Sequence, residues 1–308
     1  MRIAFFGTPE FAVPSLETLL DLGESVVTVV TQPNRPKGRS HSTLVPPPIK
    51  VRALAAGLPV FQPERPQGDE FVAALRAADL DLGVVVAYGH ILRPAVLGIP
   101  RLGMINVHAS LLPRWRGAAP IPWAIAHGDR VTGVTIMAME AGLDSGPIVL
   151  ARETPIGPEE TAGELTVRLA SLGAAALADA IRRYRDGVPA LIPQDHGAAT
   201  VAPKVGRDVA RLDWSKPAEA VADTIRAFDP TPAAWTTLGD SELKLFRPRT
   251  AKFGGAPGTV VALDPFTIAA GSGSVALAEV QPAGSARMAT PQWIRGRGRS
   301  VRVGDRCR

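Results

Sequence analysis

Short apolar runs alternate with helix-like segments through the first 189 residues, and this alternation limits the possible folds more than any other feature. Strands are predicted at 2–6, 25–31, 83–87, 104–107 and 133–139, where the runs are apolar and rich in β-branched residues. Helices are predicted between them at 14–22, 68–78 and 120–127, with a long one after them at about 159–185. Unbroken apolar strands separated by helices are typical of a parallel sheet covered on both faces. We therefore predict a doubly wound, Rossmann-like α/β domain over residues 1–189.

The last third of the chain has a different pattern. Residues 190–207 are polar and interrupted by proline, which is typical of a linker. After them a helix is predicted at 218–228, and strands at 234–238, 243–247, 258–263, 266–270 and 274–280. Short strands at close spacing with glycine turns indicate a small, OB-like β-barrel over residues 208–308, an architecture suited to binding RNA.

Charge is distributed unevenly along the chain. Its 308 residues include 34 Lys and Arg against 29 Asp and Glu, a net charge of +5. Residues 1–189 hold equal numbers of basic and acidic side chains, so the whole surplus lies in the C-terminal region. Clustered positive charge favours a polyanionic partner such as nucleic acid, because phosphate contacts release counterions. The alternative is a basic surface that only aids solubility.

Composition and missing motifs exclude several classes of protein. Cys307 is the only cysteine, which excludes an internal disulfide and a zinc site of several thiolates, and we expect no metal. The cysteine content fits a reducing, cytoplasmic location. No apolar run approaches the roughly 20 residues of a membrane span, so we expect no membrane association. The usual motifs of nucleotide hydrolysis, zinc proteolysis, serine hydrolysis and dinucleotide binding are missing.

Two polar side chains end the predicted strand at 104–107. Asn106 and His108 are two residues apart, so a strand points both to the same face. In open α/β sheets, ligands bind at the carboxyl ends of the strands, where this pair is expected. An amide beside an imidazole can polarise a carbonyl and move a proton, as acyl or formyl transfer requires. The alternative is a hydrogen-bonded polar pair that merely ends the strand.

A carboxylate follows in the loop 142–146, where Asp144 stands between glycines just after the strand predicted at 133–139. We expect it at the same carboxyl edge of the sheet, where it can orient His108 or stabilise its charged form. In such turns an aspartate often only bonds its own backbone, which is the alternative.

Two further segments look like binding loops. Residues 109–120 hold too many apolar and basic groups for a simple connection. The segment 32–48 is longer than the roughly 2–6 residues of an ordinary βα connection, and it carries Arg35, Lys37 and Arg39 without an acidic residue among them. These cations can contact a phosphate backbone; a plain surface insertion is the alternative.

Taken together, these segments resemble the methionyl-tRNA formyltransferase family. The resemblance rests on FGTPEFA at 6–12, TQPNRP at 31–36, VVAYG at 85–89, NVHASLLPRWRGAAPI at 106–121 and GLDSG at 142–146. It extends through the second domain in RLDW at 211–214, IRAF at 225–228 and QPAG at 281–284. It implies transfer of a formyl group from 10-formyltetrahydrofolate to the α-amine of methionyl initiator tRNA, by a monomer.

The resemblance also assigns site residues. It implies that His108 accepts the proton of the amine, that Asp144 supports the imidazolium and that the Asn106 amide donates to the oxyanion. The remaining positions are implied contacts with the two substrates. Folate is expected along Ser110, Leu111, Leu112 and Pro113 and along Val86, Tyr88, Gly89, His90, Ile91 and Leu92, and the tRNA acceptor end at Arg35, Lys37 and Arg39.

Two other functions fit parts of this pattern. Folate-dependent formyltransferases that act on a small amine, such as a ribonucleotide or a nucleotide sugar, need the same three catalytic groups. We expect the basic β-rich domain and the Arg39 loop to favour tRNA, since a small acceptor does not need them. An RNA-binding protein with an inactive α/β domain needs the charge asymmetry but not Asn106, His108 and Asp144 together.

Overall fold

The computed structural model describes residues 1–37 and 43–308 of the chain. They form two compact units. The first comprises Met1–Ala118, Thr132–Thr154 and Thr166–Ala202, and the second comprises Ala119–Val131, Pro155–Leu165 and Pro203–Arg308. This division differs from the one proposed from the sequence, because residues 190–202 group with the first unit and 119–131 and 155–165 group with the second.

The first unit is built on a seven-stranded sheet in the order β5-β2-β1-β6-β7-β8-β9. Its strands are β1 Arg2–Gly7, β2 Ser25–Val30, β5 Val60–Phe61, β6 Leu82–Val86, β7 Met104–His108, β8 Val131–Ala138 and β9 Ile148–Pro155. The pairings from β5 through β7 are all parallel. The chain builds outward from β1 in both directions, which places a topological switch point between β1 and β6, where ligands bind in folds of this class.

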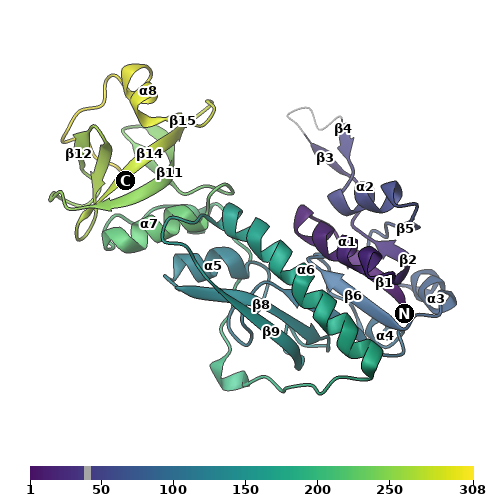
Figure 1. Ribbon diagram of the computed structural model, residues 1–308. Coiled ribbons are helices and arrows are strands. Elements are labelled where there is room, and N and C mark those ends of the chain that lie inside the picture. The colour runs from purple at the N-terminus through teal and green to yellow at the C-terminus, as the bar shows by residue number, and fades with distance from the viewer. Residues whose placement is uncertain (38–42) are drawn as a thin grey trace. The chain divides into compact units, whose positions relative to one another are not determined.

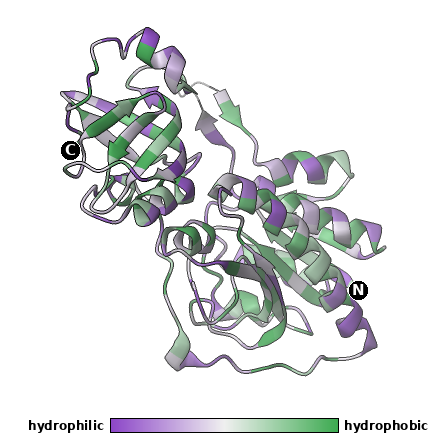
Figure 2. Ribbon diagram, turned by 60° about the vertical axis from the view of Figure 1, so that its left-hand side comes forward, coloured by the Kyte–Doolittle hydropathy of each residue, from purple (hydrophilic) through white to green (hydrophobic). Residues whose placement is uncertain are grey.

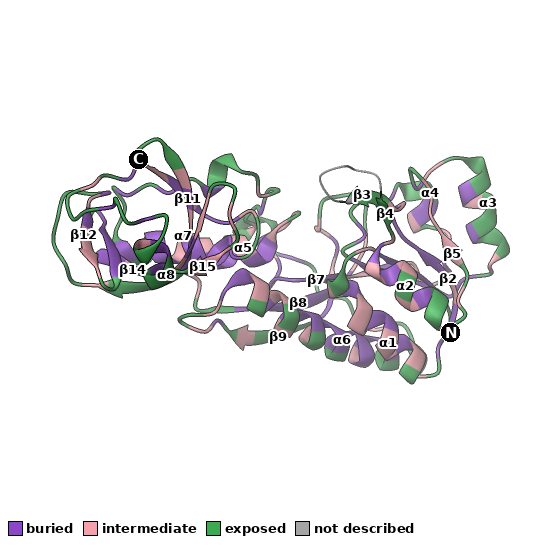
Figure 3. Cartoon of the chain, turned by 90° about the horizontal axis from the view of Figure 1, so that it is seen from above, coloured by how far each residue is buried: buried purple, intermediate pink, exposed green. Residues whose placement is uncertain are grey.

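Helices cover both faces of this sheet. The helices of the unit are α1 Val13–Asp21, α2 Pro48–Ala55, α3 Asp69–Ala77, α4 Pro94–Leu97 and all but the first turn of the long α6 Ala162–Asp186. Figures 1 and 3 show α1 and α6 on one face and α3 and α4 on the other. The prediction of a doubly wound α/β domain is therefore confirmed.

One strand runs against the others. β8 pairs with β7 in antiparallel register, with His108 opposite Thr135 and Ile105 opposite Ala138. The carboxyl end of β8 therefore lies beside the start of β7, not beside its end. The loop after β8 therefore begins at the opposite edge of the sheet, and the assumption that this strand runs parallel to its neighbours is wrong.

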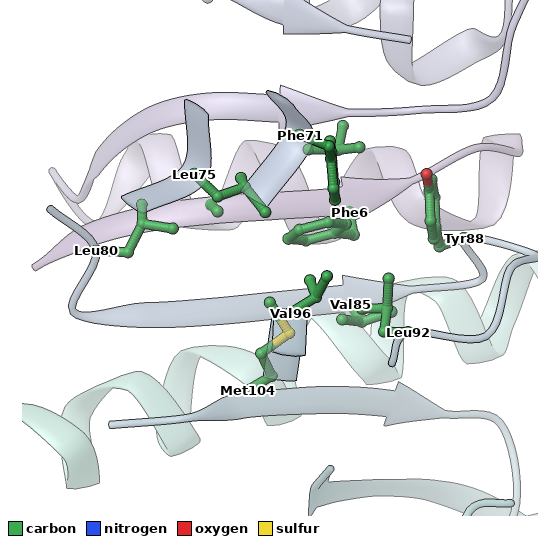
Figure 4. Close-up of a cluster of buried hydrophobic side chains, with 11 residues drawn as sticks. Phe6, Phe71, Leu75, Leu80, Val85, Tyr88, Leu92, Val96 and Met104 are labelled. Carbon is green, nitrogen blue, oxygen red and sulfur yellow. The ribbon is translucent and has the colours of Figure 1, made fainter. Parts of the chain in front are cut away.

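Hydrophobic side chains of the sheet pack against those of its helices. Figure 4 shows Phe6 of β1, Val85 of β6 and Met104 of β7 in one cluster with side chains of α3 and α4. Figure 2 shows mostly hydrophobic strands and helices in which hydrophobic and hydrophilic residues alternate. This is the pattern expected of amphipathic helices packed on a buried sheet.

Shorter elements complete the first unit. They are the 3₁₀ turns Glu10–Ala12 and His196–Ala198 and the two-stranded hairpin of β3 Arg35–Lys37 and β4 Thr43–Val45. Neither hairpin strand was predicted, because three residues are too few to establish a period.

The second unit contains an antiparallel sheet in the order β10-β11-β14-β13-β12, and β15 also pairs with β14. Its strands are β10 Trp235–Leu238, β11 Ser241–Ala251, β12 Val260–Leu263, β13 Phe266–Ala269, β14 Ser274–Pro282 and β15 Met288–Ala289. Its helices are α5 Pro120–Ala126, α7 Ala218–Ala227 and α8 Thr290–Arg295, with a 3₁₀ turn at Asp208–Ala210. The prediction of a small, OB-like β domain is confirmed, its sheet is antiparallel, and the first five of these strands correspond to the five predicted.

The C-terminal residues join the two outer strands of this sheet. Cys307 bridges Leu238 of β10, and Arg306 bridges Thr259 at the start of β12. The backbone N–H of Val260 also donates to the carbonyl of Asp305 at 2.8 Å. The chain end thus supplies the pairing that closes the sheet, which removes its exposed edges.

Candidate active site

Asn106 and His108 lie on the face of the sheet covered by α3 and α4. They share this face with Met104, which belongs to the cluster beneath those helices. The intervening residue, Val107, lies on the opposite face of the sheet, next to α6. A Cβ added to Gly173 of α6 would stand 2.9 Å from Val107 Cγ1. The alternation predicted from the sequence therefore orients both side chains, and His108 is only 5% exposed.

Asp144 reaches both of these side chains. Asn106 Nδ2 donates to Asp144 Oδ1 at 3.4 Å, and His108 Nδ1 lies 3.7 Å from Asp144 Oδ2. The same Oδ2 accepts a 2.9 Å hydrogen bond from the backbone N–H of Gly117. The structure thus brings together the amide, the imidazole and the carboxylate that sequence reasoning singled out.

The hydrogen bonds of His108 define which nitrogen is free to act. Its Nε2 lies 2.9 Å from the carbonyl oxygen of Trp115. A carbonyl only accepts, so in the neutral ring Nε2 carries the hydrogen and donates it. Nδ1 is then unprotonated and faces the Asp144 carboxylate, where it can accept a proton and have the resulting charge balanced.

The Asp144 loop reaches the site by folding back from the end of β8. Gly146 lies against that strand so closely that a Cβ would stand 1.9 Å from the carbonyl oxygen of Ala138. Asp144 itself has a φ of 46°, in the left-handed region that non-glycine residues rarely occupy. This close approach allows the loop to turn back toward Asn106.

Sequence reasoning did not identify the backbone groups that hold His108 and Asp144. The carbonyl of Trp115 and the N–H of Gly117 come from the loop that follows β7, which was recognised as a binding loop without individual roles. Main-chain groups leave no signature in residue type. The only signal for this position is Gly117, whose φ of 119° favours glycine.

The segment expected to contact folate after β7 is anchored on β8. Thr135 Oγ1 donates to the carbonyl of Ser110 at 2.7 Å and accepts from the N–H of Leu112 at 3.1 Å. Ser110 Oγ donates to the carbonyl of Arg114 at 2.6 Å. These bonds fix the course of residues 110–113, next to His108, and the Leu112–Pro113 peptide bond is cis.

The second expected folate segment is divided between core and surface. Val86, Tyr88 and Leu92 are buried, whereas Gly89 and Ile91 are exposed and His90 is half-buried. Burial raises the pKa of Tyr88 to about 12, and its hydroxyl has no hydrogen-bond partner within the described part of the chain. Of this segment, residues 89–91 therefore have side chains or backbone at the surface that can face a ligand.

The basic residues expected to meet tRNA lie on or beyond the β3–β4 hairpin. Arg35 is exposed, and its Nη2 donates to Gln32 Oε1. Lys37 is the last residue of β3, and its side chain and the whole of Arg39 lie outside the described residues.

The described ranges hold neither a metal-binding cluster nor a membrane-spanning helix. Within 1–37 and 43–308, the His, Cys, Asp and Glu side chains form no group of three that could hold a metal ion. Among the same residues, every helix is too short or too polar to cross a membrane.

Comparison with known proteins decides the family. The formyl transferase family model matches residues 1–181, and the model of the formyl transferase C-terminal domain matches residues 204–298. The methionyl-tRNA formyltransferase of Citrifermentans bemidjiense is 46% identical, covering 96% of this chain and 93% of the relative. The methionyl-tRNA formyltransferase of Symbiobacterium thermophilum is 48% identical, covering 99% of this chain and 95% of the relative. The chain belongs to the methionyl-tRNA formyltransferase family.

Two solved structures of low sequence identity have a similar fold. HypX from Aquifex aeolicus, in complex with tetrahydrofolic acid, matches 99% of this chain and 50% of its own with a TM-score of 0.66 at 18% identity. An N-formyltransferase from Helicobacter canadensis, with folinic acid and dTDP-3-aminofucose, matches 92% of this chain and 99% of its own. Its TM-score is 0.68 at 16% identity. These likenesses show that the methionyl-tRNA formyltransferase family shares its fold with both proteins.

Proposed function

We propose that the protein transfers the formyl group of 10-formyltetrahydrofolate to the α-amine of methionyl initiator tRNA. The chain is 46–48% identical over nearly its whole length to methionyl-tRNA formyltransferases, which supports methionyl-tRNA as the acceptor. The folate ligands named for two proteins of the same fold support the donor class. The observation that carries the chemistry is the meeting of Asn106, His108 and Asp144 within hydrogen-bond and ion-pair distances.

His108 acts as the general base in this proposal. As the amine nitrogen forms its bond to the formyl carbon, Nδ1 of His108 takes the proton that the nitrogen releases. Asp144 balances the positive charge on the ring, and the bond from Nε2 to the Trp115 carbonyl keeps the ring oriented. The bond from the formyl carbon to the folate nitrogen then breaks, and that nitrogen receives the proton.

Asn106 stabilises the opposite charge. Negative charge develops on the formyl oxygen during the attack, and an amide N–H already held in place lowers its energy without reorganisation. The long 3.4 Å contact of Asn106 Nδ2 with Asp144 leaves this donor weakly engaged. We propose that it donates to the formyl oxygen from the position it already holds.

The surface near these groups suits a folate. Ile91 is 82% exposed and Leu143 is 60% exposed, and each lies in a proposed site segment or directly beside Asp144. We propose that these exposed apolar side chains cover the flat face of the pterin ring. We therefore place the donor along residues 89–91 and 110–113, with the formyl group toward His108.

The second domain does not by itself select tRNA as the acceptor. The Helicobacter canadensis enzyme, named with a sugar-nucleotide ligand, shares the fold over 92% of this chain. A second domain is therefore compatible with a small acceptor, contrary to the expectation from the sequence. The choice of tRNA rests on sequence identity and on the basic residues.

An acceptor competition tests the proposal. The protein is incubated with 10-formyltetrahydrofolate and an equimolar mixture of methionyl initiator tRNA, elongator methionyl-tRNA and a small ribonucleotide amine. We expect formylmethionyl initiator tRNA as the main product. Preferential formylation of the small amine would assign the protein to the alternative class.

A further inference from the structure

The segment predicted from the sequence to be a linker is hydrogen-bonded to two loops of the active site, the loop after β7 and the loop that carries Asp144. We call residues 190–202 the strap. Its Ile192 pairs antiparallel with Ile148 at the start of β9, and its Val201 pairs with Arg116 of the loop after β7. The backbone N–H of Arg116 donates to the Thr200 carbonyl at 2.9 Å, and that of Ala202 donates to the Arg116 carbonyl at 2.7 Å. The strap is thus paired to the first unit at both of its ends.

Within the described residues, Gln194 is the one strap side chain that is hydrogen-bonded both to the Asp144 loop and to the loop after β7. Its Nε2 donates to the carbonyl of Asp144 at 3.0 Å and to that of Gly146 at 2.7 Å. Its Oε1 accepts from Arg116 Nε at 3.1 Å and from Arg116 Nη2 at 2.6 Å. Gln194 is only 6% exposed, whereas its strap neighbours on either side are exposed.

The two loops need such support. Asp144 and Trp115 have φ values of 46° and 61°, conformations that cost energy for residues with a side chain. Strained residues keep their conformation only where surrounding contacts impose it. Thr200 adds one such contact, because its Oγ1 accepts from the N–H of Trp115 at 2.9 Å.

We propose that Gln194 is a positioning residue for formyl transfer. By clamping the Asp144 loop to Arg116, it keeps the Asp144 carboxylate on the Gly117 N–H and beside His108. It touches no reacting atom and acts only through Asp144. This inference rests on the proposed function, since it needs a reaction in which Asp144 takes part.

The test is the substitution Gln194→Glu. The new carboxylate has nearly the same shape and still accepts from Arg116, but it has no hydrogens for the carbonyls of Asp144 and Gly146. We expect kcat to fall roughly 10- to 100-fold, as misplacement of a catalytic group by about 1 Å can do. The KM values for folate and for tRNA should change less than about 3-fold, because Gln194 is buried and offers almost no surface to either substrate.

A double substitution separates positioning from general destabilisation. If Gln194 acts through Asp144, adding Gln194→Glu to Asp144→Asn should lower kcat by less than about 2-fold. Asp195→Asn is the matched control, because Asp195 is the next strap residue and is exposed, and within the described residues its side chain accepts only from the Gly197 N–H. It should leave kcat unchanged.

The outcomes are distinct. A wild-type protein that forms no formylmethionyl-tRNA would overturn the proposed function itself. An active wild type with normal kcat in Gln194→Glu, or with an equal loss in both backgrounds, would overturn the positioning role. Gln194→Ala and thermal melting accompany the test, and failure of both Gln194 variants to fold would assign the residue a purely structural role.

Discussion

Replacing Asp144 by asparagine isolates the charge of the carboxylate from its shape. The introduced amide can still accept from the Gly117 N–H and occupies nearly the same volume. It cannot balance a positive charge on His108, and its own N–H groups can donate to the unprotonated Nδ1, which stabilises the state that should take up the proton. We therefore expect catalysis to fall while the fold is kept.

The size of the effect follows from the 3.7 Å between His108 Nδ1 and Asp144 Oδ2. At an effective dielectric constant of roughly 20, two unit charges at this distance attract by about 4–5 kcal/mol. The Asp144 side chain is 17% exposed, so solvent screening reduces this value, and about 2–3 kcal/mol is a reasonable net contribution. Lost from the transition state, this energy corresponds to roughly a 10²-fold lower kcat.

The assay is formylation of methionyl initiator tRNA with both substrates saturating, so that kcat and KM are measured separately. Glu140→Gln is the control, because it removes an exposed acidic charge from the same loop without a role at His108. A kcat within about 3-fold of wild type in Asp144→Asn, or an equal loss in Glu140→Gln, would refute the reasoning.

Three further predictions concern single groups. Gly146→Ala should lower kcat about 10-fold or more, because a Cβ would stand 1.9 Å from a backbone carbonyl oxygen. Gly142→Ala should be milder, because its Cβ would meet only the movable side chain of Ser145. Steady-state kinetics of the two variants that reverse this order would contradict the prediction. Tyr88→Phe removes a buried hydroxyl without a partner among the described residues, so the free energy of unfolding in a urea titration should rise by about 1 kcal/mol, and a clear fall would contradict the packing. Burial raises the pKa of the Cys307 thiol to about 12, so the folded protein should react with a thiol reagent far more slowly at mildly alkaline pH than the unfolded chain does. Because the pKa is raised, the thiol contributes to stability below its ordinary pKa of 9.0, and this contribution is lost as the pH rises toward 12. Equal reaction rates in the folded and the unfolded protein would refute the burial.

The sequence predicts the main elements of the fold because its apolar periods are clear. β1, β2, β6 and β7 fall within one or two residues of the runs that predict them, and so does α7 of the second unit. The sequence does not reveal strand direction, because an apolar run reads the same in a parallel and an antiparallel pair. The antiparallel pairing of β8 therefore had to come from the structure, as did the two-residue strand β5.

The side chains of the site were predictable, but their supports were not. Asn106 and His108 share a face by the period of two, and Asp144 stands out between glycines. The route of the Asp144 loop depends on the direction of β8, which no local pattern encodes. Gln194 lies in a polar, proline-interrupted stretch, and its burial follows only from long-range pairing of that stretch with the catalytic loops.

The residues 304–308 illustrate the same limit. Their arginines counted only toward the basic surplus of the C-terminal region, whereas the backbone of this stretch pairs with β10 and β12 and closes the second sheet. Backbone pairing between segments about 50 to 70 residues apart leaves no periodic trace in a short, charged stretch.

The most direct measurement for the account is the single-turnover rate of formyl transfer by His108→Ala, with 10-formyltetrahydrofolate and methionyl initiator tRNA both saturating. The account predicts a rate at least ~10²-fold below wild type with tRNA affinity nearly unchanged, because the proton acceptor is lost and the binding surfaces are not. A variant that transfers the formyl group at the wild-type rate would show that the imidazole between Asp144 and the Trp115 carbonyl is not the base.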